Sequence, residues 1–221
     1  MGELAYVVIP AYNEASRIMP VLEAVRAADA SIVSTSTIIV VDNGSSDTTF
    51  ETAHKITDHV ISCSERGKGY AMRRGVAYAK QCGAQIITFL DADQTGLRGD
   101  HIDSLSRPVV EGEAAMTIGV MGARSWLGQT SVIAAFSGQR CLTIDIWDKL
   151  SAEDIKGWRT EAALNAIFLN SQRESETRFV YLDGVGQVNK FSKGRPVLQS
   201  GMDYVRMSGS ALRGLWSRAS L

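Results

Sequence analysis

The residues best suited to chemistry are two aspartates, Asp91 and Asp93, that directly follow an apolar run at residues 86–90. Residues two apart in an extended chain project to the same side, so the two carboxylates can converge on one point. Carboxylates at the end of a buried strand are costly unless a cation meets them. Because hard oxygen ligands suit Mg²⁺ or Mn²⁺, the pattern predicts a divalent-cation site. The alternative is an ordinary turn, in which aspartate is also common.

The chain before these aspartates alternates short apolar runs with segments of helical periodicity. Strands are expected at residues 4–9, 38–41, 59–61 and 86–90, and helices after each of the first three. We expect Pro10 to end the first strand and Ser16 to cap the first helix. This alternation predicts an α/β fold with a parallel sheet that helices cover on both faces.

Polar residues gather where these strands end, and ligands of parallel sheets bind at that edge. Tyr12 and Glu14 follow the first strand, and Asp42 follows the second. Arg66 and Lys68 open the third helix, where the helix N-terminus favours anions. Together with a cation site, these residues would suit a nucleoside diphosphate. Packing, capping and surface charge are the ordinary alternative roles for each of them.

Four segments resemble, in order and spacing, the family 2 glycosyltransferases with the A-type fold, and most closely the dolichol- or polyprenyl-phosphate sugar transferases. The segments are VIPAYNE at 8–14, VDNGSSD at 41–47, Gly67-Lys68-Gly69 and Asp91-Ala92-Asp93. The resemblance is close over residues 4–93 and extends to about residue 124. It implies a single A-type domain whose mostly parallel central sheet has a Rossmann-like nucleotide-binding half.

The resemblance also implies roles for individual residues. Tyr12 and Asp42 would contact the base, and Lys68 would lie near the nucleotide. Asp91 and Asp93 would meet Mg²⁺ or Mn²⁺ on the diphosphate. When the part of the chain after Asp93 is included, the expected substrate-binding residues are Pro10, Tyr12, Glu14, Asp42, Lys68, Asp91, Arg124 and Arg140.

Arg124 is included because Gly122-Ala123-Arg124 matches a Gly-x-Arg of the lipid-phosphate branch. Arg140 could meet a phosphate or lie at the surface, and residues 132–150 could cover the site or pack on the sheet. The chain departs from the family at Asn43, where a second acid is common. It also departs at Gln94, which directly follows Asp93 where the branch often reads D-A-D-x-Q.

Glu161 is the expected general base, because its position resembles a Gly-x-x-x-Glu segment that faces the acceptor in several family members. A hydroxyl acceptor wants such a base, whereas a phosphate acceptor does not. The alternative is an ordinary acid in the first turn of a helix. Asp93 and Glu161 are thus the expected catalytic residues.

The composition of the chain indicates its general class and its expected division into domains. The 221 residues are 45% hydrophobic, 21% charged and of net charge −1, as in an ordinary soluble protein. No apolar run reaches the roughly 18–20 residues that span a bilayer, and three scattered cysteines fit a reducing cytoplasm. We expect a glycosyltransferase domain at 1–184, with a nucleotide-sugar-binding half at 1–93 and an acceptor half at 94–184.

Residues 185–221 form a separate basic segment, with six basic residues and one acidic residue. This segment therefore carries net charge +5, and the 184 residues before it carry −6. We expect it to contact an anionic membrane surface peripherally on the cytoplasmic face; packing on the core or on a partner chain is the alternative. Nucleic acid is not an expected partner, and a homo-oligomer stays open.

The sequence thus predicts a metal-dependent, inverting hexosyltransferase. It would use a UDP- or GDP-sugar donor and a lipid-linked acceptor, with polyprenyl phosphate favoured. The alternatives are transfer to a glycerolipid or glycan hydroxyl, a retaining transferase, a sugar-phosphate nucleotidyltransferase, and a non-catalytic nucleotide-sugar-binding scaffold.

Overall fold

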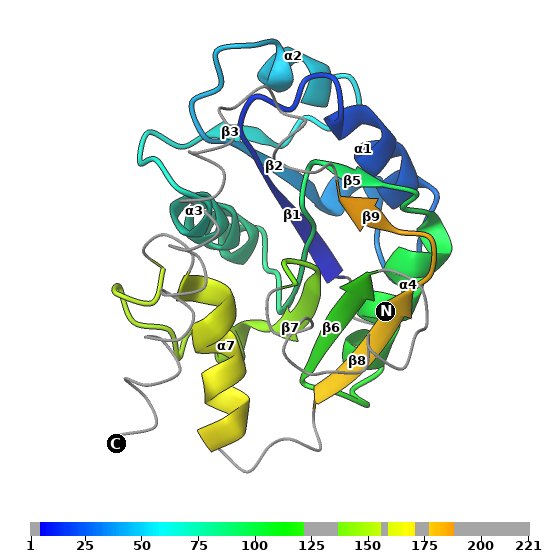
Figure 1. Cartoon of the computed structure of the whole chain (residues 1–221), viewed down its shortest axis with the longest axis vertical. Helices are drawn as coiled ribbons and strands as arrows, with labels where there is room; N and C mark the ends of the chain where they lie inside the picture. The colour runs from blue at the N-terminus through cyan, green and yellow to red at the C-terminus, as the bar shows by residue number, and fades with distance from the viewer. Residues whose placement is uncertain (1–4, 122–136, 156–158, 171–176, 188–221) are drawn as a thin grey trace.

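The computed structural model describes residues 5–121, 137–155, 159–170 and 177–187 (Figure 1). Within these residues, a seven-stranded sheet has the order β3-β2-β1-β4-β7-β6-β8. Its strands are β1 (Ala5–Ala11), β2 (Ile38–Asp42), β3 (Val60–Ser62), β4 (Ile86–Phe89), β6 (Met116–Met121), β7 (Arg140–Thr143) and β8 (Thr177–Leu182). A small second sheet pairs β5 (Gln94–Thr95) with β9 (Gly186–Gln187).

The large sheet is parallel except for one strand. Each neighbouring pair among β3, β2, β1 and β4 is parallel, and so is the pair of β6 with β8. Strand β7 lies between β4 and β6 and is antiparallel to both. The predicted fold, a mostly parallel sheet flanked by helices, is confirmed.

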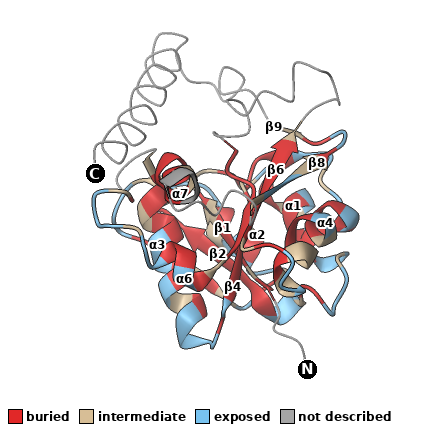
Figure 2. Ribbon diagram, turned by 90° about the horizontal axis from the view of Figure 1, so that it is seen from below, coloured by how far each residue is buried: buried red, intermediate tan, exposed pale blue. Residues whose placement is uncertain are grey.

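Helices cover both faces of this sheet (Figure 2). One face packs against α1 (Ile18–Arg26), α2 (Thr49–Ala53) and α4 (Gly99–Val110), and the other against α3 (Lys68–Gln81), α6 (Ile144–Trp147) and α7 (Arg159–Asn170). Successive side chains of β1 point to opposite faces of the sheet. Val7 and Ile9 therefore pack in the core on the first face, and Val8 packs in the core on the second. Because β1 is covered on both sides, it is apolar throughout rather than alternating with polar residues.

Three details differ from the sequence prediction. Strand β1 continues through Pro10, which pairs in register with Val41, and ends at Ala11. Ser16 does not cap α1; the N-cap is Arg17, and the backbone N–H groups of Arg17 and Ile18 donate to the Glu14 carbonyl. Within the described part of residues 132–150, β7 forms a central strand, which neither expectation included, and α6 packs on the sheet as one of them predicted.

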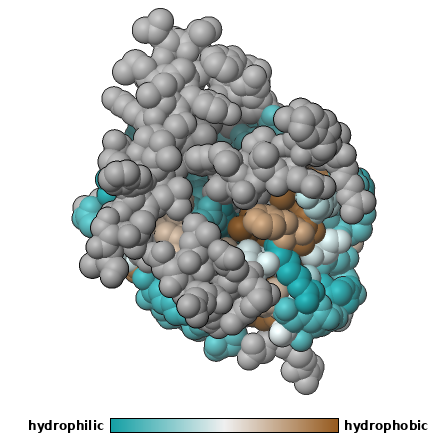
Figure 3. Space-filling model, turned by 60° about the horizontal axis from the view of Figure 1, so that its bottom comes forward, coloured by the Kyte–Doolittle hydropathy of each residue, from teal (hydrophilic) through white to brown (hydrophobic). Residues whose placement is uncertain are grey.

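The basic segment is described only at its start. Val185 is buried and β9 follows it, so residues 185–187 pack on the domain. The rest lies outside the described residues, and its membrane contact stays a prediction. None of the described helices is long and apolar enough to cross a bilayer. The described part of the surface in Figure 3 is largely hydrophilic, with a larger apolar area on the right of the view and a smaller one on the left.

Candidate active site

The site lies at the edge of the sheet where β1, β2 and β4 end. Asp42 is the last residue of β2, and a single residue, Leu90, separates Asp91 from the end of β4. Strand β7 runs the other way, so it begins at this same edge, with Arg140 opposite Phe89 of β4. The parallel strands therefore deliver the residues that follow them, and β7 delivers the residues that precede it.

The carboxylates of Asp91 and Asp93 converge as the sequence predicts. The side-chain amide nitrogen of Gln187, on β9, lies 2.8 Å from Oδ1 of Asp93 and 3.4 Å from Oδ2 of Asp91. Since one atom reaches both carboxylates, one small cation could also contact both. The described residues contain no cluster of three or more His, Cys, Asp or Glu side chains. Such a cation would therefore share its remaining coordination with neutral or substrate oxygens, as Mg²⁺ commonly does.

Lys68 joins Asp91 to Glu161 in the first turn of α7. Its ammonium lies 2.7 Å from Oδ1 of Asp91 and 2.8 Å from Oε1 of Glu161. Burial alone would lower the pKa of Lys68, but the two carboxylates outweigh burial and raise it above its usual value. Lys68 therefore stays protonated and holds the first turns of α3 and α7 together.

Two glycines make this approach feasible. A Cβ on Gly138 would lie 2.5 Å from the Lys68 ammonium and 2.6 Å from Oδ2 of Asp91. A Cβ on Gly69 would lie 2.8 Å from the Thr160 hydroxyl and closer still to the Ile155 carbonyl. A larger residue at either position would push α7 or Lys68 away from the site.

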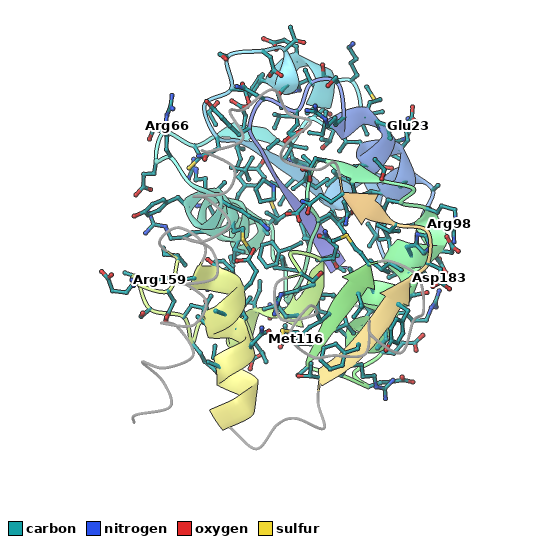
Figure 4. All side chains as sticks on the ribbon, in the orientation of Figure 1. Glu23, Arg66, Arg98, Met116, Arg159 and Asp183 are labelled. Carbon is teal, nitrogen blue, oxygen red and sulfur yellow. The ribbon has the colours of Figure 1, made fainter. Side chains whose placement is uncertain are left out.

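Tyr12, Asp42 and Arg66 lie at or after the carboxyl ends of β1, β2 and β3. The guanidinium of Arg66, labelled in Figure 4 on the loop before α3, lies 5.8 Å from the centre of the Tyr12 ring. A planar cation over an aromatic ring leaves a flat platform of the kind on which a base can stack. Asp42 is 6% exposed, and its carboxylate accepts from the Ser45 backbone N–H at 3.3 and 3.4 Å.

Glu14 supports the first loop, and Pro10 lies before it within β1, paired with Val41. The Glu14 carboxylate accepts from Arg17 at 3.2 Å, and its backbone N–H donates to the Thr49 hydroxyl at 2.8 Å. Asn13 next to it has φ +55° and donates through its backbone N–H to the Ser45 hydroxyl. The loops after β1 and β2 thus fix each other before any nucleotide binds.

Asn43, the departure from the family, holds a different loop. Its side-chain amide donates to the carbonyls of Glu65 at 2.6 Å and Cys63 at 3.4 Å. Its side-chain carbonyl accepts from the Gly67 backbone N–H at 2.8 Å. A carboxylate could accept but could not donate, so this position requires an amide for the loop that leads to Lys68.

Arg140 was expected either to meet a phosphate or to lie at the surface, and the structure shows neither arrangement. It is completely buried, donating to the Ser137 carbonyl at 2.9 Å and to Oδ1 of Asn165 at 2.6 Å. Burial lowers its pKa to about 10, and the charge of Glu161 opposes that shift. Arg140 is therefore neither a surface residue nor an accessible phosphate ligand in this structure. It lies beneath Glu161, which is itself buried in the first turn of α7.

Arg124 lies outside the described residues. The residues that the sequence reasoning missed are Gly138, Gln139 and Gln187, of which Gln139 also contacts Asp91. The available signal for the first two was the polar break Ser137-Gly138-Gln139-Arg140 between two apolar stretches. Nothing in the local sequence marks Gln187, because a strand pairing brings it to the aspartates.

Solved structures with this fold include glucosyl-3-phosphoglycerate synthases from Mycobacterium tuberculosis. One, in complex with Mn²⁺, UDP-glucose and phosphoglyceric acid, is 22% identical with a TM-score of 0.78, covering 100% of this chain and 80% of that one. Another, with Mg²⁺ and UDP, is 21% identical with a TM-score of 0.76 and the same coverage. A third, with Mn²⁺, UDP and glucosyl-3-phosphoglycerate, is 22% identical with a TM-score of 0.77, covering 100% and 81%.

A search of curated protein sequences found no match. The family model described as "Glycosyl transferase family 2" matches residues 6–141, which contain the loops after β1 and β2, Lys68 and both aspartates. That match covers more than half of the chain. The chain therefore belongs to glycosyltransferase family 2.

Proposed function

We propose that this transferase moves a hexosyl group from a UDP-sugar to an acceptor hydroxyl, with Mg²⁺ or Mn²⁺ at Asp91 and Asp93. One observation carries the proposal: the aspartate pair, Lys68 and Glu161 meet at one edge of the sheet, linked by contacts of 2.7 and 2.8 Å. The similar M. tuberculosis synthases bind UDP together with Mn²⁺ or Mg²⁺, which supports this choice of donor and ion.

The chain's own groups fit the parts of a UDP-sugar. A divalent cation supplies positive charge to the departing diphosphate. Lys68 would add its ammonium to the same phosphates by turning from Asp91, whose charge the cation would then neutralise. The base would stack on the platform that Tyr12 and Arg66 form, and Asp42 would accept from base or ribose donors. Placing fixed charges before reaction is the largest usual source of rate enhancement in such sites.

Glu161 favours a hydroxyl acceptor over a phosphate. Its buried carboxylate would repel an anionic phosphate nucleophile but could take the proton from a hydroxyl. The acceptor named for the similar synthases is phosphoglyceric acid, a small phosphorylated hydroxy acid. We therefore place an acceptor of that class first. A polyprenyl phosphate is second, supported by the net charge of +5 on residues 185–221.

Product analysis tests both candidates. The full chain is incubated with Mn²⁺ and either UDP-glucose or GDP-mannose, and with either 3-phosphoglycerate or polyprenyl phosphate in anionic vesicles. We expect a glucosylated phosphoglycerate, detected by mass spectrometry, from UDP-glucose. A product only on the lipid would replace the first acceptor by the second. No transfer to any acceptor, with UDP binding intact, would contradict the proposed acceptor classes.

A further inference from the structure

Gln139 contacts Asp91 at two points from beneath the site. Its side-chain amide nitrogen donates to Oδ2 of Asp91 at 3.1 Å, and its side-chain carbonyl accepts from the Asp91 backbone N–H at 3.3 Å. The residue is completely buried. A fully buried carboxamide that uses both ends on one aspartate fixes both the backbone and the carboxylate of that aspartate.

Gln139 is itself held firmly by the start of β7. Its backbone carbonyl accepts from the Gly119 N–H at 2.8 Å, and its backbone N–H donates to the Ser137 hydroxyl at 3.3 Å. The Ser137 hydroxyl in turn donates to the Gly119 carbonyl. Gly119 leaves the room that this requires, because a Cβ there would lie 2.9 Å from Cβ of Gln139. The side chain therefore has little freedom to leave Asp91.

We infer that Gln139 is a positioning residue that orients the Asp91 carboxylate for the divalent cation. The inference rests on the proposed cation site. Oδ1 of Asp91 faces Lys68, and Oδ2 receives the amide of Gln139. Two different partners on its two oxygens fix the rotation of the carboxylate plane. Without Gln139, the carboxylate can rotate toward Lys68, and a cation must then reorient it on binding.

Loss of such a supporting hydrogen bond typically weakens metal binding by about 10–100-fold. A misoriented Asp91 carboxylate should change the Mn²⁺ dependence of activity in a characteristic way. The Mn²⁺ concentration for half-maximal activity should rise by that factor, whereas turnover at saturating Mn²⁺ should recover to within about threefold of wild type. General damage to the fold would instead lower turnover at every Mn²⁺ concentration.

The test measures Mn²⁺ binding directly. Free Mn²⁺ is quantified by electron paramagnetic resonance in the presence of saturating UDP, for the wild type, Gln139→Met and Gln139→Asn. Methionine keeps the volume of the side chain but removes its donor. Asparagine keeps a buried amide, which protects the fold, but is one methylene too short to reach both points. Gln85→Leu is the matched control, because Gln85 is an exposed glutamine just before β4.

We expect both Gln139 variants to bind Mn²⁺ at least about tenfold more weakly, with Gln85→Leu unchanged. Wild-type affinity in either folded variant would overturn the inference. Asp93→Ala separates the two proposals: if it loses Mn²⁺ and the Gln139 variants do not, the cation site stands and the role of Gln139 fails. If the wild type binds no Mn²⁺, both fail.

Discussion

The two halves of the sheet bring side chains to the same edge in opposite ways. In the half that we propose binds the donor, the donor half at residues 5–93, the parallel strands β1, β2 and β4 end at the site, and their loops carry the proposed binding groups. In the acceptor half, β7 begins there, and residues 137–140 reach the site from below. A single reversed strand thus places four consecutive residues under a site that the parallel strands could only border.

The contacts that hold the site in place also differ between the two halves. Donor-side loops are held by hydrogen bonds between neighbouring turns, such as Asn13 with Ser45 and Asn43 with Gly67. Acceptor-side contacts join distant segments through buried charge, as when Lys68 meets Glu161, 93 residues away. We therefore expect donor-side substitutions to change binding locally, and acceptor-side substitutions to change stability and chemistry together.

The largest effect is expected from Asp93→Ala. Removing half of the cation site should lower turnover by roughly 10³–10⁵-fold, because metal stabilisation of the leaving group contributes several kcal/mol. The fold should persist, because the ion pair of Asp91 with Lys68 stays in place without Asp93. Transfer assays and circular dichroism measure the two quantities. Unchanged activity at saturating Mn²⁺ would refute the metal role.

Glu161→Gln should have the next largest effect. Transfer to a hydroxyl acceptor should fall by about 10²–10⁴-fold, because the amide cannot take the proton. UDP affinity should change by only a few-fold. The matched control is Glu153→Gln, whose side chain is 65% exposed. A near-normal rate with the hydroxyl acceptor would mean that Glu161 is structural and that another group takes the proton.

Gly138→Ala tests the close approach of the two halves. The added methyl group would overlap the Lys68 ammonium and Asp91, so we expect a loss of about 1–3 kcal/mol in the free energy of unfolding. Mn²⁺-dependent UDP binding should weaken as well. Gly112→Ala is the comparison: Gly112 has φ +74° and open space around it, so it should lose stability through backbone strain alone. Equal UDP binding in both variants would argue against the steric account.

A smaller and more local effect is expected from Asn43→Asp. The carboxylate removes two donated hydrogen bonds to the loop at residues 63–67, at about 1 kcal/mol each. UDP affinity should fall by about threefold to tenfold, as measured by titration, and the melting temperature should fall by about 4–8 °C. An increase in Mn²⁺ affinity would show instead that position 43 faces the cation.

The sequence predicted the donor half well because its information is local. Apolar runs, helical periodicity and the spacing of Asp91 and Asp93 together define the parallel strands and the polar edge. Strand β7 was missed because Arg140–Thr143 is short and is a strand only through its pairing with β4 and β6. Nothing local distinguishes it from the start of a helix.

The same reasoning explains the individual errors. The sequence of Arg140 gives no sign that Ser137 and Asn165 will bury it, because that burial depends on where α7 packs. Gln187 reaches Asp93 across 94 residues through the pairing of β9 with β5. The position of the loop-motif residues at this edge of the sheet could be predicted, whereas the residues that support the site from distant segments could not.

The most direct test of the central claim is calorimetric titration of the full chain with UDP and with GDP, each with Mn²⁺ and with a chelator. The claim is that a cation held by Asp91 and Asp93 completes a uridine diphosphate site. We predict that UDP binds at least about tenfold more tightly with Mn²⁺ than without it, and more tightly than GDP. UDP binding that is the same in chelator, or absent in both conditions, would contradict the claim.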